Sequence, residues 1–182
     1  MTTVNATLKY PIGRFERPGK IDRITLNNWI AQIETLPERL LRLTNPLSSE
    51  QLDTPYRPDG WTVRQVLHHI ADSHTNSYIR FKWALTESKP TIKAYDEKAW
   101  ADLFDTRTAP IELSLSYLRA LHAKWVYLLK GLSDSDLQKE FIHPSTQNLV
   151  PLDENIGLYA WHGEHHYMHI KNLIDRKGWF SL

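Results

Sequence analysis

The sequence predicts an all-α protein built as a four-helix bundle. Four long segments have apolar residues that recur every three or four positions, which is the spacing of one helical face. Helix-start signals precede most of these segments, and proline or glycine separates them. A chain of 182 residues is long enough to bury one core, so we expect a single domain over residues 1–182.

The first long helix is expected after an irregular segment over residues 1–20, which proline and glycine interrupt. Asp22 suits the N-cap position of this helix. Its apolar positions have helical spacing, at Trp29, Ile30, Ile33, Leu36, Leu40 and Leu41. Pro37 lies inside the pattern and is expected to kink the helix or divide it.

Two capping boxes mark the next two helices. Ser48 and Gln51 predict a short helix, because each can bond the other's backbone N–H. Thr62 and Gln65 predict, in the same way, the start of a long helix that runs to about Glu87. The apolar positions of the long helix are Val63, Val66, Leu67, Ile70, Tyr78, Phe81 and Leu85.

Residues 88–108 are predicted to form a long loop with some local structure at 95–103. Loops of this length often border a functional site. A third long helix follows, with Pro110 in its first turn and apolar residues from 111 to 128. Ser133 predicts a further short element after this helix.

The segment before the last helix, residues 141–152, contains Pro144 and Pro151 and predicts a small β-hairpin. Asp153 is expected to cap the last long helix. This helix should end near Gly178, because glycine is common just after a helix end.

The composition limits the possible partners and chemistry. The formal net charge is +1, so no basic field is available to attract nucleic acid. Cysteine is absent, which excludes disulfides, cysteine ligands and a cysteine nucleophile. No stretch approaches the roughly 18 apolar residues of a membrane span, and no secretory signal is visible. We therefore expect a cytoplasmic protein that binds neither nucleic acid nor membrane.

A cluster of histidines near the C-terminus carries the strongest chemical signal. Two pairs have i,i+4 spacing, His162 with His166 and His165 with His169. Side chains four residues apart share one face of a helix, so two imidazoles can bind one metal ion. At about 100° per residue, His162 and His166 lie at the edge of the buried stripe, whereas the other pair lies further round. The helical phase therefore favours His162 and His166 as metal ligands.

A third ligand must come from another helix, and the spacing of the residues leaves it open. Residues 63–87 offer His68, His69 and His74, of which His74 lies in the middle of the apolar stripe and fits a hydrogen-bonded core histidine. His68 and His69 lie on opposite sides of the stripe. His122 and His143 remain possible, but no pattern supports them.

Two known metal motifs are excluded. Position 163 is glycine, where the His-Glu-x-x-His motif of zincins has its glutamate. Glu164 lies roughly opposite the predicted ligand pair and is expected to be a solvated or ion-paired surface carboxylate. Carboxylate di-iron bundles need Glu-x-x-His on two helices, and the one occurrence, residues 140–143, runs into Pro144.

Four segments resemble the DinB/YfiT superfamily and are closest to its YfiT branch. They are residues 51–74, 76–82, 95–100 and 158–162, which read QLDTPYRPDGWTVRQVLHHIADSH, NSYIRFK, YDEKAW and LYAWH. The likeness covers nearly the whole chain, and its motifs are long and follow one another in order.

The resemblance implies a four-helix bundle that holds one divalent metal ion, zinc or nickel, through three histidines. It assigns His69 as the third ligand beside His162 and His166, and it implies a homodimer. Position 164 is glutamate where the YfiT branch has another histidine. This position lies off the ligand face, so the departure leaves the predicted site intact.

Three functions are compatible with such a site. A three-histidine ion keeps coordination positions open, so the first is hydrolysis of a small-molecule substrate by metal-activated water, as implied for the YfiT branch. The second, known in the wider superfamily, is transfer of a low-molecular-weight thiol such as bacillithiol, bound as thiolate. The third is a non-catalytic helical interaction module stabilised by the metal. Arg80 and Tyr78 are candidates for substrate contacts. The alternative for Arg80 is a surface ion pair, and the alternative for Tyr78 is packing in the core.

Overall fold

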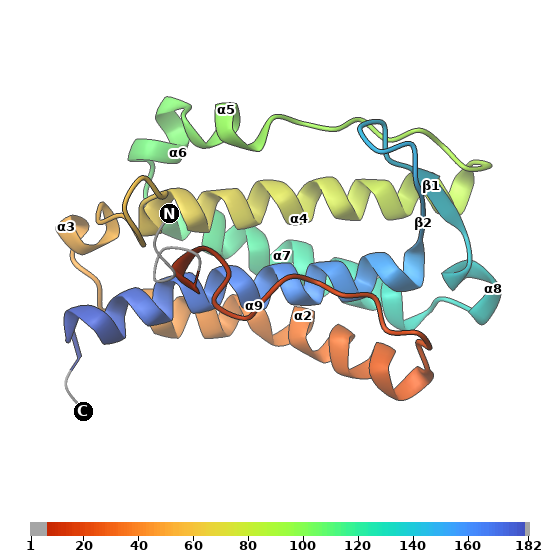
Figure 1. Ribbon diagram of the computed structural model, residues 1–182, viewed down its shortest axis with the longest axis horizontal. Coiled ribbons are helices and arrows are strands. Elements are labelled where there is room, and N and C mark those ends of the chain that lie inside the picture. The colour runs from red at the N-terminus through yellow and green to blue at the C-terminus, as the bar shows by residue number, and fades with distance from the viewer. Residues whose placement is uncertain (1–6, 181–182) are drawn as a thin grey trace.

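The computed structural model describes residues 7–180. The bundle consists of four long helices, which are α2 (Arg23–Thr44), α4 (Val63–Thr86), α7 (Ile111–Lys130) and α9 (Leu152–Lys177). α2 and α4 each pack against both α7 and α9, so the helices alternate around the bundle axis (Figure 1). The predicted four-helix bundle is confirmed.

Short elements occupy the connections between the long helices. They are α3 (Ser49–Leu52), α5 (Glu97–Ala101), α6 (Phe104–Thr108), α8 (Asp134–Leu137), β1 (Glu140–Ile142) and β2 (Leu149–Pro151). The antiparallel pair β1 and β2 forms the predicted hairpin before the last helix. The segment expected to be mainly loop contains two short helices, α5 and α6, which both pack against α4 (Figure 1). Local structure therefore extends further along this segment than the sequence indicated.

The predicted helix starts at α2, α3 and α4 are confirmed. Asp22 Oδ1 accepts a hydrogen bond from the N–H of Thr25 at 2.8 Å. The box of Thr62 and Gln65 is complete, because each side chain accepts a bond from the other residue's N–H. The same arrangement opens α3. At the other end of the chain, Gly178 follows α9 with φ of 61°, a left-handed conformation that glycine adopts without a Cβ clash.

Two predicted helix starts were misplaced. α9 begins at Leu152 directly after Pro151, so Asp153 is inside the first turn and is not the N-cap. Pro151, the last residue of β2, is itself the N-cap, because its φ of −65° suits the start of a helix, and no side chain caps this end of α9. Pro110 is likewise the N-cap of α7 and precedes its first turn.

Pro37 does not divide the first long helix, because α2 runs unbroken through it. Leu36 and Leu40 on either side are buried in the same apolar cluster. Burial of one continuous face stabilises the helix on both sides of the proline, although the proline lacks an N–H to donate.

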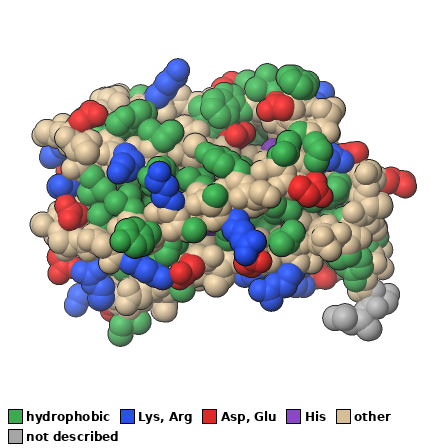
Figure 2. All heavy atoms as spheres, turned by 180° about the vertical axis from the view of Figure 1, so that it is seen from behind, with side chains coloured by type: hydrophobic (Ala, Val, Ile, Leu, Met, Phe, Trp, Pro, Cys, Tyr) green, Lys and Arg blue, Asp and Glu red, His purple; other side chains and the backbone are tan. Residues whose placement is uncertain are grey.

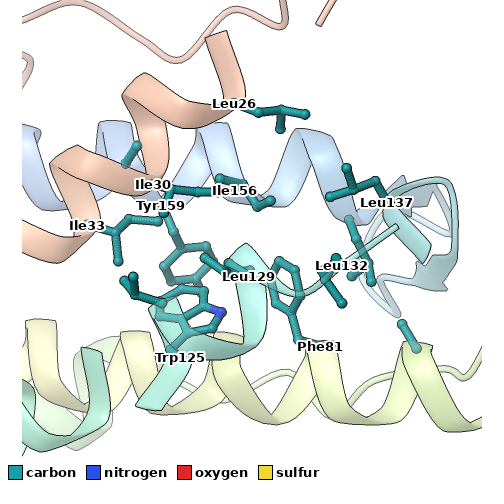
Figure 3. Packing of buried hydrophobic residues seen from close by; sticks show 14 of the residues in the cluster. Leu26, Ile30, Ile33, Phe81, Trp125, Leu129, Leu132, Leu137, Ile156 and Tyr159 are labelled. Carbon is teal, nitrogen blue, oxygen red and sulfur yellow. The ribbon is translucent and has the colours of Figure 1, made fainter. Parts of the chain in front are cut away.

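Buried apolar side chains form two clusters along the bundle axis. One contains Phe81, Trp125 and Tyr159, whose rings pack together in Figure 3. The other contains Leu36, Leu67 and other residues nearer the opposite ends of the same four helices. Between the two clusters, three of the helices carry buried or half-buried histidines, which are His74, His122, His162 and His166. A polar layer therefore crosses the middle of the core, and its groups need hydrogen-bond partners.

The surface has no comparable concentration of histidine on the face shown in Figure 2, where apolar, basic and acidic side chains alternate. Within residues 7–180, no helix is both long and apolar enough to cross a membrane.

Gly163 permits the close contact between α9 and α2 at the level of this layer. A Cβ at this position would lie 2.5 Å from Leu36 Cδ2 and 3.6 Å from His74 Cε1. Any larger residue would therefore force the Leu36 side chain out of its present position beside His74. Packing accounts for the glycine at the position where zincins have their catalytic glutamate.

Candidate metal centre

His69, His162 and His166 converge between α4 and α9. One ring nitrogen from each lies within 4.8 Å of the others. The Nε2 atoms of His69 and His162 are 3.2 Å apart. Two nitrogens bound to one tetrahedral ion at 2.0–2.1 Å would be about 3.3 Å apart. The spacing of the two nitrogens therefore fits ligation of a single ion.

The three imidazoles are held in their neutral form. Burial, and after it the neighbouring His165, lowers the pKa of His69 to about 4. Burial, followed by the other histidines of the cluster, holds the pKa of His162 and of His166 well below the usual value. Neutral imidazole has a free lone pair, which is the form that binds metal.

A chain of hydrogen bonds sets the tautomer of His162. The Nδ1 atom of His122 lies 2.6 Å from the carbonyl oxygen of Ile33, and because a carbonyl only accepts, this nitrogen carries the hydrogen. His122 Nε2 then accepts from His74 Nδ1 at 2.9 Å. His74 Nε2 in turn accepts from His162 Nδ1 at 3.1 Å. The lone pair of His162 is therefore on Nε2, the atom that faces His69.

A second chain sets the tautomer of His166. His169 Nε2 donates to the carbonyl oxygen of Lys9 at 3.1 Å, so its Nδ1 carries a lone pair. This atom accepts from His166 Nδ1 at 3.3 Å, which leaves Nε2 of His166 free for an ion. Hydrogen bonds of this kind orient metal-binding histidines and fix their tautomers. The residues present therefore fit a divalent metal ion on three imidazole nitrogens.

The remaining candidate histidines have other partners. His68 donates from Nε2 to the carbonyl oxygen of Ala109 at 3.2 Å, and its Nδ1 accepts from the Ser114 hydroxyl at 2.6 Å. Both of its ring nitrogens are therefore occupied on the α7 side of α4. His74 is fully buried, as its place in the apolar stripe indicated, and His122 lies next to it in the same chain.

His165 and His169 are buried, although the helical phase placed them away from the buried stripe. The ring of Tyr56 stacks on His169 at 4.0 Å, and that of Tyr10 lies 5.9 Å from His165. Segments outside the long helices therefore bury this face of α9. The periodicity of apolar residues within α9 could not predict this burial, because the covering residues lie elsewhere in the sequence. With His166, these two residues form a second group of nitrogens within 4.8 Å.

Glu164 is ion-paired as expected. Its carboxylate accepts two hydrogen bonds from the Arg39 guanidinium, at 2.7 and 3.0 Å. Arg39 also lies over the ring of Tyr167, 4.1 Å from its centroid. Glu164 therefore links α9 to α2 through this ion pair, and both of its carboxylate oxygens already accept hydrogen bonds from Arg39.

A cavity of about 270 Å³ opens beside His162. Its lining comes from α4, α9, the start of α5 with the segment before it, and the hairpin loop. It consists of Ser73, Arg80, Ala94, Tyr95, Glu97, His143, Ser145, Leu158, Tyr159 and His162. A second cavity, of about 290 Å³, has no histidine in its lining and involves Ile21, Leu26 and Asp153. Of the two cavities, only the one of about 270 Å³ includes a predicted ligand in its lining.

The two candidates for substrate contacts differ in position. Arg80 is buried and lines the cavity beside His162, so the alternative of a surface ion pair is wrong. Tyr78 packs against the apolar cluster around Trp125 and is not part of the cavity lining. Tyr95 and Tyr159 also line the cavity, and no local sequence pattern indicates this, because only the folded chain brings them next to α4.

The metal-free protein should lose stability as the pH falls below about 6.5. Burial lowers the pKa of His122, His165 and His69 each to about 4, so the unfolded chain takes up protons before the native state does. The contribution of each such histidine is fully present above the pKa that it has in the unfolded chain. Between that pKa and its lower native pKa, the free energy of unfolding falls by about 1.4 kcal/mol per pH unit and per histidine. Urea unfolding at pH 7.5 and pH 5.0 should therefore differ by several kcal/mol. Equal free energies of unfolding would contradict the neutral, buried cluster.

Comparison with known proteins agrees with this architecture. The family profile described as the DinB superfamily matches residues 32–170. A relative from Oceanobacillus iheyensis is 53% identical over 171 residues, which are 94% of this chain and 98% of the relative. YfiT from Bacillus subtilis is 48% identical over 179 residues, covering 98% of this chain and 99% of YfiT. Both relatives are provisionally named metal-dependent hydrolases.

The solved structure of Bacillus subtilis YfiT is similar to this one over nearly its whole length. The TM-score is 0.94 at 46% sequence identity, with 96% of this chain and 99% of YfiT covered. That protein is described as "a probable metal-dependent hydrolase with an unusual four-helix bundle topology". On its sequence and its fold, this chain belongs to the DinB superfamily.

Proposed function

We propose that this protein is a metal-dependent hydrolase that holds one divalent ion, zinc or nickel, through His69, His162 and His166. The observation that carries the proposal is the position of His162. It is the one partly exposed member of the three, and it lines the cavity of about 270 Å³. A substrate in the cavity would therefore contact one of the three residues that hold the ion. A volume of this size suits a small molecule.

A divalent ion on three protein ligands keeps open positions, lowers the pKa of water toward about 7 and polarises a carbonyl group. The protein supplies the geometry for this chemistry. The His74–His122 chain fixes the ring of His162, and Trp61 packs on His69 with ring centroids 4.6 Å apart. Burial raises the pKa of Tyr95, so its hydroxyl stays protonated and can donate a hydrogen bond to substrate in the cavity.

Turnover assays test the proposal. Zinc-loaded and nickel-loaded protein should hydrolyse activated esters or amides, and a chelator should abolish the activity, which the same metal should restore. If the protein conjugates a low-molecular-weight thiol to an electrophile and hydrolyses nothing, its function is that of a thiol transferase and the hydrolase proposal is wrong. If neither reaction is observed with the fully loaded protein, the metal stabilises a non-catalytic module and the proposal is wrong.

A further inference from the structure

Arg80 is a buried cation without an acidic partner among the described residues. It is 8% exposed, and Nη1 donates to the hydroxyl of Tyr159 at 3.3 Å. Its Nε is fully buried and has no hydrogen-bond partner within residues 7–180. None of the ion pairs in that part of the chain includes Arg80. An unpaired buried charge is costly, so its presence beside a cavity indicates a ligand of opposite charge.

The free edge of the guanidinium has the shape of a carboxylate site. Nη1 donates to Tyr159, and within residues 7–180 neither Nε nor Nη2 has a hydrogen-bond partner. These two N–H groups lie parallel along one edge and match the two oxygens of a carboxylate. Arginine pairs with carboxylates in this bidentate way, and lysine does not.

The other polar groups of the cavity are compatible with an anion. Among the residues that the structure describes, His143 Nδ1 is buried without a hydrogen-bond partner, and burial together with the charge of Arg80 lowers the pKa of His143. A neutral imidazole can donate a hydrogen bond to the same ligand. Glu97 is the acidic residue of the lining, but its side chain is exposed and its charge is screened by solvent. Arg80 is therefore the buried charge of the cavity.

Arg80 lies within reach of the metal centre. It follows His74, the partner of His162, by six residues on α4, which is about 9 Å along the helix axis. Long side chains on a helix point toward its N-terminus, so the guanidinium extends back toward the histidine layer. A substrate anion bound here would sit at most about 9 Å from the level of His162.

We propose that Arg80 binds a carboxylate group of the substrate, so that the protein acts on small carboxylic acids with a hydrolysable bond a few atoms from the acid. The role of this site in catalysis rests on the proposed function, whereas the binding of a carboxylate at Arg80 is independent of the proposed function.

Binding is tested on the metal-free, full-length protein by NMR of the arginine Nε–H resonances. Acetate should shift the Arg80 resonance to saturation, acetamide should leave it in place, and inorganic phosphate should bind more weakly than acetate. The proposal is overturned if acetate has no effect, if acetamide acts equally, or if phosphate binds more tightly than acetate. Because the signal comes from the unaltered protein, this test does not depend on a variant that folds.

Turnover tests the role in substrate selection, with mono-4-nitrophenyl adipate and its neutral terminal amide as matched esters. A charged hydrogen-bonded pair contributes roughly tenfold to a hundredfold in affinity. Arg80→Gln should lower the ratio of kcat/KM for the acid over the amide by this factor, and Arg80→Lys should lower it less. Arg119→Gln, which alters an exposed arginine on α7 paired with Glu38, is the matched control and should keep the ratio. An unchanged ratio in Arg80→Gln would show that Arg80 is structural and would overturn the proposal.

Failure of the proposed function is distinguishable from failure of this inference. If the wild-type protein hydrolyses neither ester, the hydrolase proposal fails, while the acetate titration still decides whether Arg80 is a carboxylate site.

Discussion

Replacement of His69, His162 or His166 by alanine is expected to reduce the affinity for zinc by well over a hundredfold. Each variant leaves two imidazoles, whereas protein zinc sites use at least three side chains. Loss of a group that only orients a ligand already costs about tenfold to a hundredfold, so loss of a ligand should cost more. Competition with a chromophoric chelator measures the dissociation constant of each purified variant.

His68→Ala is the matched control, since His68 precedes His69 on α4 but bonds to Ser114 and Ala109. It should retain the wild-type affinity. His165→Ala separates the two groups of histidine nitrogens in the same way, because His165 belongs only to the second group. If either control loses zinc while His69→Ala keeps it, the assignment of the ligands is wrong.

Replacement of His122 by phenylalanine is expected to lower the zinc affinity by about tenfold to a hundredfold, although His122 is not in the predicted ligand set. Without His122, the lone pair that accepts from His74 Nδ1 is lost, and His74 can rotate or change tautomer. The hydrogen on Nδ1 of His162 then has no fixed acceptor. Phenylalanine keeps most of the ring volume, so the effect should come from the lost hydrogen bonds.

Nitrogen NMR of the metal-free protein supplies a readout that packing alone would not change. His162 should carry its hydrogen on Nδ1 in the wild type and should populate the other tautomer in His122→Phe. His169→Phe is the parallel variant for the second chain and should alter the tautomer of His166 instead. Wild-type affinity and an unchanged His162 tautomer in His122→Phe would refute the role of the chain.

The fold was predictable because its signals are local. The cap at Asp22 and the box at Thr62 and Gln65 act over three residues, and the structure confirms both. The start predicted at Asp153 was wrong because a second local signal lies two residues before it. Pro151 ends the strand and also begins the helix. Short-range patterns thus define the long helices but leave a one- or two-residue uncertainty where two signals compete.

The candidate site was less predictable, because its geometry depends on contacts between distant segments. Helical phase could not separate His68 from His69, since the two lie on opposite sides of one apolar stripe, and only the family resemblance chose between them. Their different surroundings come from α7 and α9, which are far away in sequence. The cover over His169 likewise comes from Lys9 and Tyr56, which belong to no long helix.

The cavity beside the centre illustrates the same limit. Arg80 was a candidate from the sequence, but its surroundings include Tyr159 of α9, which accepts its hydrogen bond, and the segment with Tyr95, which lines the same cavity. No periodicity within α4 reports those neighbours. A charged residue on a helix is usually solvated, so the sequence alone favours the surface interpretation.

The most direct test of the metal centre is a crystal structure of the zinc-loaded protein with an anomalous difference map at the zinc edge. We expect one strong peak per chain, about 2.0–2.1 Å from the Nε2 atoms of His69, His162 and His166. The Nδ1 atoms of His162 and His166 should stay hydrogen-bonded to His74 and His169. A peak between His165 and His169, ligation through Nδ1, or no peak in fully loaded crystals would contradict this ligand set.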